Sequence, residues 1–255
     1  METKNTEKRD SKKASPKLVD LGPKNAGNID RMFAVGAHFG YSKSRRHPSV
    51  KPYIFGMKNW VEIIDLEKTN NLLTTATEFA EKLGSEDKKI LFVGSKNEAK
   101  TTIEESAGSI NMPYVTGRWI GGTITNFSEI KKRINRMEDL ISKREKGEFV
   151  GKYTKKEQLM LSREIENLKT NFFGVRSLLE NPNALFVVDT KNEDTAVKEA
   201  RQKGIPIIGL LNSDSDLTEI DYPIVANDAT CASIKFFVDE IVKAYRKGIS
   251  KRKQE

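Results

Sequence analysis

The chain has 255 residues, with 37% hydrophobic and 31% charged side chains and a net charge of +8 at pH 7. Its longest apolar runs fall short of the ~18 residues that a membrane-spanning helix needs, which excludes a membrane protein. A single cysteine excludes an internal disulfide, and with only two histidines it argues against a zinc site of nitrogen and sulfur ligands.

The two ends of the chain hold the excess of positive charge. Residues 1–28 carry seven basic and four acidic side chains, and the stretch from Lys243 to Glu255 carries six basic side chains and one acidic one. Because charged, aromatic-free segments bury little apolar surface, we expect a flexible extension over 1–28 and a basic tail over 247–255. Either end can settle on a polyanion or simply aid solubility. The first residues lack the apolar core of a signal peptide, so we expect none there, and their four acidic side chains argue against a mitochondrial transit peptide.

The middle of the chain alternates short apolar strands with amphipathic helices. Strands are expected at 61–64, 90–93, 113–115, 184–188, 205–211 and 222–225, the last at a sheet edge because of its proline. Helices are expected at 67–83, 97–109 and 192–203, followed by a final helix that ends near Arg246. Uniformly apolar strands separated by helices are typical of a parallel sheet covered on both faces, which predicts an α/β domain over 29–125 and 181–246.

Residues 126–180 interrupt this alternation with two heptad-like patterns and no strand. Apolar side chains recur at spacings of three and four from Ile130 to Ile141 and again from Leu161 to Leu179. Thr154 and Glu157 match a capping box at the start of the second helix. We therefore predict an inserted antiparallel, coiled-coil-like helical hairpin. Its narrow apolar seams favour a projecting arm over a hairpin that packs on the sheet as extra cover.

An α/β sheet of this type is compatible first of all with a nucleotide-dependent enzyme. The strand-to-helix turns contain neither a G-x-G-x-x-G pattern nor a Walker A sequence. Gly94-Ser95-Lys96 can seat one phosphate, and Asp65 and Asp189 end two strands, although carboxylates there are common helix caps. A nucleotide- or sugar-phosphate-binding enzyme therefore stays as the alternative.

Three basic stretches favour nucleic acid instead. Residues 36–58 interleave cations with aromatics and glycines, residues 117–127 place Arg118 beside Trp119, and residues 131–136 cluster cations on the first hairpin helix. Trp119 can equally plug the base of the hairpin, and the helix cations can be plain solvated surface. We expect the cations to converge on one flank of the molecule. The candidate RNA-binding residues are Lys43, Arg45, Arg46, His47, Lys51, Lys58, Lys96, Arg118, Trp119, Lys131, Lys132, Arg133 and Arg136.

Several motifs, in order, resemble one family. They are Gly36-Ala37-His38-Phe39-Gly40, Lys51 to Gly56, Ile63 to Thr69, Ile90 to Gly94, Arg118 to Phe127, Ala184 to Asp189, Ala196 to Ala200 and Gly204-Ile205-Pro206. From about 29 to 245 the sequence resembles the bacterial-type small-subunit ribosomal protein S-two family. It departs from the family pattern at Arg46-His47-Pro48-Ser49 and at Asn212 to Leu217.

The resemblance implies a flavodoxin-like parallel sheet with an inserted helical hairpin and no catalysis. We expect no cofactor and name no metal ligand, and the sequence leaves a structural metal ion open. It implies a structural constituent of the 30S subunit that binds 16S rRNA between head and body, in the cytoplasm, and supports subunit assembly. The expected partners are the rRNA and other small-subunit proteins, including ribosomal protein S-one, the mRNA-binding protein whose docking it supports. No membrane and no small-molecule substrate are expected.

Overall fold

The computed structural model describes residues 26–252, and its centre is a five-stranded parallel sheet. The strands are β4 (Ile90–Val93), β5 (Tyr114–Val115), β6 (Ala184–Val188), β7 (Ile207–Leu211) and β8 (Tyr222–Val225), in the order β5-β4-β6-β7-β8. Every residue of β4, β6 and β7 is buried, which explains why these strands are uniformly apolar. The strand order is that of a flavodoxin-like sheet, so the predicted fold class is confirmed.

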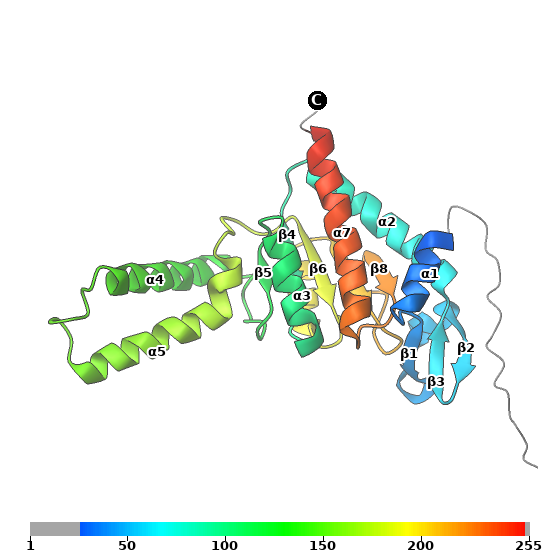
Figure 1. Ribbon diagram of the computed structural model, residues 1–255, viewed down its shortest axis with the longest axis horizontal. Helices are drawn as coiled ribbons and strands as arrows, with labels where there is room; N and C mark the ends of the chain where they lie inside the picture. The colour runs from blue at the N-terminus through cyan, green and yellow to red at the C-terminus, as the bar shows by residue number, and fades with distance from the viewer. Residues whose placement is uncertain (1–25, 253–255) are drawn as a thin grey trace, which may run out of the picture.

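Helices cover both faces of this sheet (Figure 1). On one face α2 (Leu66–Ser85), α3 (Asn97–Gly108) and α7 (Cys231–Arg252) pack on the alternate strand residues that include Phe92 and Phe186. On the other face α6 (Asp194–Gln202) and the base of the helical hairpin pack on Leu91 and Leu185. The result is a three-layer α/β arrangement with a separate apolar core on each side of the sheet.

The predicted strand at 61–64 exists but belongs to a different sheet, so its assignment to the parallel sheet was wrong. After α1 (Ala26–Ala34), strands β1 (Phe39–Ser42), β2 (Ile54–Lys58) and β3 (Val61–Ile64) form an antiparallel sheet in the order β1-β3-β2. Only alternate residues of β3 are buried, and one of them is Glu62. That alternation is typical of an antiparallel strand with one covered face.

The hairpin consists of α4 (Phe127–Glu145) and α5 (Lys155–Phe172), which extend side by side away from the sheet (Figure 1). Its seam is buried by apolar side chains of both helices, namely Ile130, Ile134, Met137 and Leu140 of α4 and Ile165 and Phe172 of α5. Thr154 and Glu157 form the predicted capping box at the start of α5. A 3-10 turn, η3 (Phe173–Val175), leads back to the sheet. The coiled-coil character of the seam stays a prediction.

The ends of the described chain are more helical than predicted. Residues 26–28 of the expected extension lie in α1, and α7 continues past Arg246 to Arg252. Along this last stretch Lys247 and Arg252 pair with Glu81 and Asp87 at 2.8 Å each, which ties it to α2 and the turn after it. The rest of the predicted extension and tail lies outside the described residues. Within 26–252, no helix combines the length and apolarity needed to cross a membrane.

Candidate nucleic-acid interface

The small antiparallel sheet carries one group of exposed cations. Lys43 and Arg45 lie in the 3-10 turn η1 (Lys43–Arg45) after β1, Lys51 lies in η2 (Pro48–Tyr53), and Lys58 ends β2. All four residues lie at the surface, and none has an ion-pair partner within residues 26–252. The guanidinium carbon of Arg45 lies 5.7 Å from the centroid of the Tyr41 ring. We call these four residues the sheet cations.

Arg46 and His47, also candidates, are held by the protein itself. The Arg46 guanidinium donates to Glu62 at 3.0 Å, and the Glu62 side chain is only 2% exposed. The backbone N–H of His47 donates to the carbonyl of Ser213 at 2.8 Å, which joins the antiparallel sheet to the end of β7. The Arg46 contact therefore stays within the antiparallel sheet, whereas the His47 contact connects the two sheets.

The loop before the hairpin is fixed by one buried carboxylate, that of Glu199 on α6. One oxygen accepts from the Trp119 indole N–H at 3.0 Å and from the backbone of Gly122 at 2.8 Å. The other accepts from the backbone N–H groups of Ile124 and Thr125 at 3.1 Å each. Burial raises the pKa of Glu199, but these hydrogen bonds outweigh it and leave the pKa below its ordinary value.

This arrangement separates the roles of Trp119 and Arg118. Trp119 is 7% exposed, and its indole N–H already donates to Glu199. It therefore anchors the loop beneath the hairpin, which is the structural one of the two roles considered for it from the sequence. Arg118 beside it is exposed, with no ion-pair partner in the described part of the chain. The role of Glu199 was missed in the sequence, because a glutamate on a helix gives no signal that it will be buried against a distant loop.

The second group of exposed cations lies on α4 and comprises Lys131, Lys132, Arg133 and Arg136, the hairpin cations. Lys132 pairs with Glu129 at 2.6 Å, and Arg136 pairs with Glu164 of α5 at 3.2 Å. Arg133 makes no ion pair with any residue between 26 and 252. Exposed pairs of this kind contribute about 0–1 kcal/mol, so phosphates can compete for these side chains at little cost.

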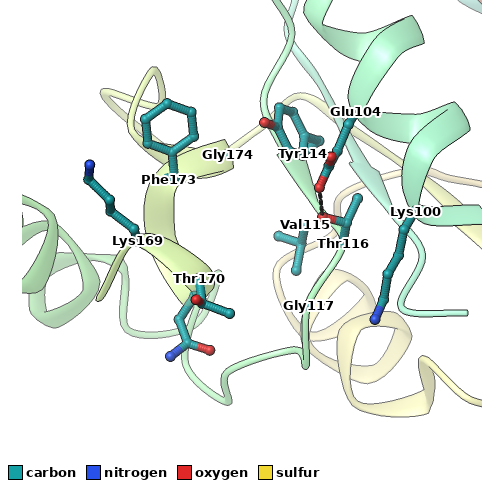
Figure 2. Close-up of a pocket in the computed structure, with 11 residues that line it drawn as sticks. Lys100, Glu104, Tyr114, Val115, Thr116, Gly117, Lys169, Thr170, Phe173 and Gly174 are labelled. Atoms are coloured by element: carbon teal, nitrogen blue, oxygen red, sulfur yellow. Dashed lines mark hydrogen bonds between the residues drawn. The ribbon is translucent and has the colours of Figure 1, made fainter. Parts of the chain in front are cut away.

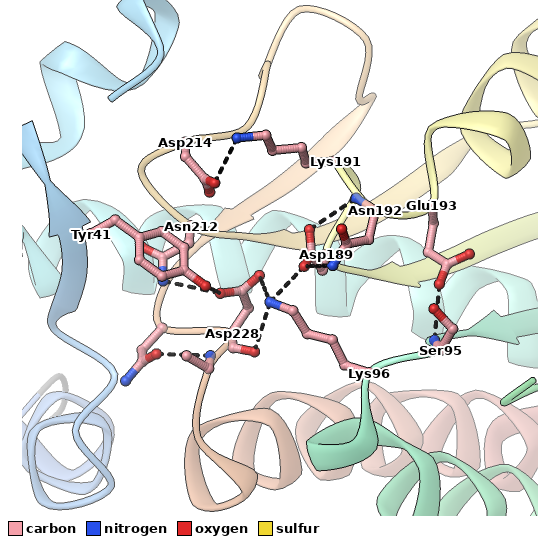
Figure 3. Close-up of polar contacts among 12 residues, drawn as sticks. Tyr41, Ser95, Lys96, Asp189, Lys191, Asn192, Glu193, Asn212, Asp214 and Asp228 are labelled. Atoms are coloured by element: carbon pink, nitrogen blue, oxygen red, sulfur yellow. Dashed lines mark hydrogen bonds and ion pairs between the residues drawn. The ribbon is translucent and has the colours of Figure 1, made fainter. Parts of the chain in front are cut away.

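Lys96 differs from the other candidates because it lies within a network at the carboxyl edge of the parallel sheet (Figure 3). Its ammonium contacts Asp189 at 2.5 Å and Asp228 at 2.9 Å, and its side chain is 17% exposed. Asn212 donates to Asp228 at 3.0 Å. Burial lowers the pKa of Lys96, but the two carboxylates outweigh it and raise the pKa above its ordinary value.

This edge is where an enzyme with such a sheet would bind its ligand. The strand order reverses between β4 and β6, and Lys96 and Asp189 follow those two strands. The backbone N–H of Ser95, the other group suited to a phosphate, already donates to the carboxylate of Glu193 at 2.9 Å (Figure 3). The donors expected to seat a phosphate are therefore occupied by carboxylates of the chain.

A groove not foreseen from the sequence lies between the base of the hairpin and the sheet. One part, of about 540 Å³, has Lys100, Tyr114 and Thr116 on one side and Lys169 and Phe173 of the hairpin base on the other (Figure 2). An adjoining part, of about 600 Å³, shares Lys100 and is also lined by Arg118, Asn192 and Glu193. Lys100 and Lys169, both absent from the candidates, add cations between the two groups.

The two cation groups lie on separate elements, and their expected convergence on one flank of the molecule stays a prediction. The antiparallel sheet and the hairpin lie at opposite ends of the long axis, with the parallel sheet between them (Figure 1). The sheet cations are therefore together, the hairpin cations are together, and Arg118 lies in the loop that connects the parallel sheet to the hairpin. The sequence does not reveal how far apart the two groups lie, because the α/β core that separates residues 43–58 from residues 131–136 forms only when the chain folds.

Comparison with known proteins identifies the family. The family model described as Ribosomal protein S2 matches residues 32–248. The chain is similar to curated proteins named small ribosomal subunit protein uS2 from three bacteria. It is 43% identical to that of a Nitratiruptor species, over 88% of this chain and 84% of the relative. The one from a Roseiflexus species is 42% identical over 91% and 88%, and the one from Coprothermobacter proteolyticus is 39% identical over 86% and 82%. The chain therefore belongs to the ribosomal protein S2 family, whose members are structural components of the small ribosomal subunit and not enzymes.

Proposed function

We propose that this protein binds 16S rRNA at two separate places, one on the small antiparallel sheet and one on the sheet-proximal half of α4, between the head and body of the 30S subunit of cytoplasmic ribosomes. The observation that carries the proposal is the position of the exposed cations. The sheet cations lie on the small antiparallel sheet and the hairpin cations on the first half of α4, with the parallel sheet between these two elements (Figure 1). The partly buried Lys96, at the edge where such sheets bind ligands, is instead neutralised by Asp189 and Asp228.

The chemistry of these contacts is recognition of the RNA backbone. Lysine and arginine side chains neutralise phosphates and fix the orientation of the protein without reading sequence. The major groove of an RNA duplex is too narrow for side chains to read, so shape and phosphate spacing select the site. A rigid protein with cation groups on both sides of its parallel sheet holds two RNA segments at a fixed separation, which supports subunit assembly.

We also propose that the far end of the hairpin takes part in docking of other small-subunit proteins, including ribosomal protein S-one. Val150 is 79% exposed, and Leu159 and Met160 at the start of α5 are 53% and 61% exposed. Exposed apolar side chains that cluster on a projecting element are typical of protein–protein contacts. This role is compatible with RNA binding, because the hairpin cations lie on α4, nearer to the sheet.

Charge reversal tests the RNA contact. We expect Lys132→Glu, Arg133→Glu and Arg136→Glu together to weaken binding to a 16S rRNA transcript and to flatten its salt dependence. Each phosphate contact contributes about 0.9 to the slope of log K against log salt, so the loss is up to about three units of slope. The same triple reversal at Lys43, Lys51 and Lys58 is expected to act in the same direction.

The control is a reversal of three exposed lysines outside both groups, Lys82, Lys203 and Lys235, which changes the net charge equally. If electrostatic attraction at large were responsible, this variant would lose as much affinity as the others. Equal losses in all three variants, or unchanged binding in the first two, contradict the proposal.

A further inference from the structure

The β2–β3 hairpin displays two aromatic side chains that no role described so far explains. Trp60 is 83% exposed and Phe55 is 81% exposed, the highest values for any large apolar side chain in the described part of the chain. Isolated exposed apolar residues are common on protein surfaces, but here two aromatics lie within six residues of one small sheet. Both of them also lie at irregular points of the backbone.

Trp60 occupies the second position of the tight turn that joins β2 to β3. Lys58 pairs with Val61, so Asn59 and Trp60 alone form the loop, and their φ angles are 50° and 65°. Such turns favour asparagine at the first position and glycine at the second. A bulky side chain with positive φ is strained, and the exposed ring gains no burial energy to offset that strain. Strain that packing does not explain points to a use of the side chain.

Phe55 is directed outward by a different device. Ile54 lies opposite Ile64 and Gly56 lies opposite Ile63, so Phe55 is the extra residue of a β-bulge. A bulge changes the direction of the side chain that it carries. The exposed fraction of 81% shows that no other part of the described chain covers the redirected ring.

The surroundings of the two rings are cationic. Lys51 lies in the turn just before the strand that carries Phe55, and Lys58 is the last residue of that strand, two residues before Trp60. Both lysines are exposed and have no carboxylate partner among residues 26–252. Aromatic rings flanked by free ammonium groups match a single-stranded nucleic acid, whose bases stack on rings while its phosphates meet cations. A duplex presents no free base faces along its length.

We propose that Phe55 and Trp60 form a stacking platform for unpaired RNA bases, with Lys51 and Lys58 at the adjoining phosphates. This inference rests on the proposed rRNA binding and names the kind of RNA that the sheet end takes. It assigns the strained turn and the bulge a common purpose, which is to hold two rings in solvent where bases reach them.

The fluorescence of Trp60 provides a direct test on the full chain. Trp119, the other tryptophan, is buried, so an added ligand that stacks on Trp60 changes mainly the Trp60 emission. We expect single-stranded oligouridylate to quench the emission saturably, and an RNA duplex with blunt ends to quench it much less. Trp60→Phe removes the quenched signal and identifies its source.

Two substitutions test the energetic contribution of the platform. Trp60→Gly and Phe55→Ala are each expected to weaken binding of oligouridylate by about tenfold, whereas Leu179→Ala, which removes another exposed apolar side chain, leaves it unchanged. Trp60→Gly keeps or raises the midpoint of thermal unfolding, because glycine suits the turn, so lost binding is not a result of misfolding.

The possible outcomes separate this inference from the proposed function. Full RNA affinity in Trp60→Gly and Phe55→Ala, measured with labelled RNA and without quenching, overturns the platform and leaves rRNA binding intact. No binding of any RNA by the full chain overturns the proposed function itself. A shift of the Trp60 emission with RNA-free small-subunit proteins, but not with RNA, replaces the platform with a protein contact.

Discussion

The carboxylate of Glu199 joins α6 to the loop from Trp119 to Thr125 that leads into the hairpin. We expect Glu199→Gln to lower the free energy of unfolding by roughly 2–3 kcal/mol at pH 7, because an amide N–H₂ faces N–H donors that then lack an acceptor. Urea unfolding measures this. Trp119→Phe removes one of the donors and serves as the milder comparison; equal stability of wild type and Glu199→Gln contradicts the assignment.

The pKa of Glu199 predicts how this contribution depends on pH. Its folded-state pKa lies below the ordinary value of a glutamate, so the charged form is stabilised by folding. The contribution is complete above the unfolded-state pKa and is lost as the pH falls through the folded-state pKa. The difference in stability between wild type and Glu199→Gln should therefore be constant near neutral pH and shrink under acid conditions below about 4. A difference that grows on acidification contradicts this.

Lys96 is a residue whose role the structure changes. We expect Lys96→Met to destabilise the fold by about 3–5 kcal/mol, because Asp189 and Asp228 are left facing each other in a buried site. Adding Asp189→Asn and Asp228→Asn removes the repulsion and should recover most of the stability. A Lys96→Met variant that folds normally but binds RNA less tightly would contradict this and show that Lys96 contacts RNA.

Among the elements, α2 and α7 pack closely because each helix places a glycine against the backbone of the other. A Cβ at Gly84 of α2 would clash with the carbonyl oxygen of Tyr245 on α7, and a Cβ at Gly248 would clash with the carbonyl of Glu81. Alanine normally stabilises a helix relative to glycine by up to about 1 kcal/mol. At these positions the steric cost reverses the sign.

We therefore expect Gly84→Ala to destabilise the protein by about 1–3 kcal/mol, as overpacking does. Gly108→Ala in α3 is the matched control, because nothing lies within 4 Å of the position that its Cβ would take, and it should be neutral or slightly stabilising. Chemical denaturation of the two variants gives the comparison. Equal effects of both substitutions show that helix propensity alone decides and contradict the packing argument.

The elements also show which parts of the fold can be read from the sequence. The runs at 90–93 and 184–188 predict their strands because strands buried on both faces must be apolar throughout. Strands β1 and β2 give no such signal, since Phe39 and Phe55 are exposed and glycines interrupt both runs. The Val61–Ile64 strand is recognisable, but its partners are not, because pairing depends on the two strands that the pattern misses.

The same limit applies to the candidate site. The sequence identifies the cations, and most of them are exposed as expected. It does not reveal that Arg46 meets Glu62, that Lys96 meets Asp189, or that Trp119 meets Glu199, because each pair is made by the tertiary fold. Charge type can therefore be predicted, whereas the availability of a charge to an outside partner depends on contacts between distant segments.

For the whole molecule, the central feature is the separation of the two cation groups by the α/β core (Figure 1). If only one of the two groups contacted RNA, charge reversal of the other group would have no effect on RNA binding. A protein that holds two RNA segments needs both. Simultaneous reversal of the two groups is expected to abolish incorporation into reconstituted 30S particles.

Directed hydroxyl-radical cleavage tests most directly whether both cation groups contact the rRNA. With Cys231→Ser removing the one native thiol, Lys58→Cys and Arg133→Cys each allow a tethered iron chelate to be placed in one cation group of a protein incorporated into 30S particles. We predict strong cleavage of 16S rRNA from both positions, in two non-overlapping sets of nucleotides. Cleavage from only one position, or from neither, contradicts the account.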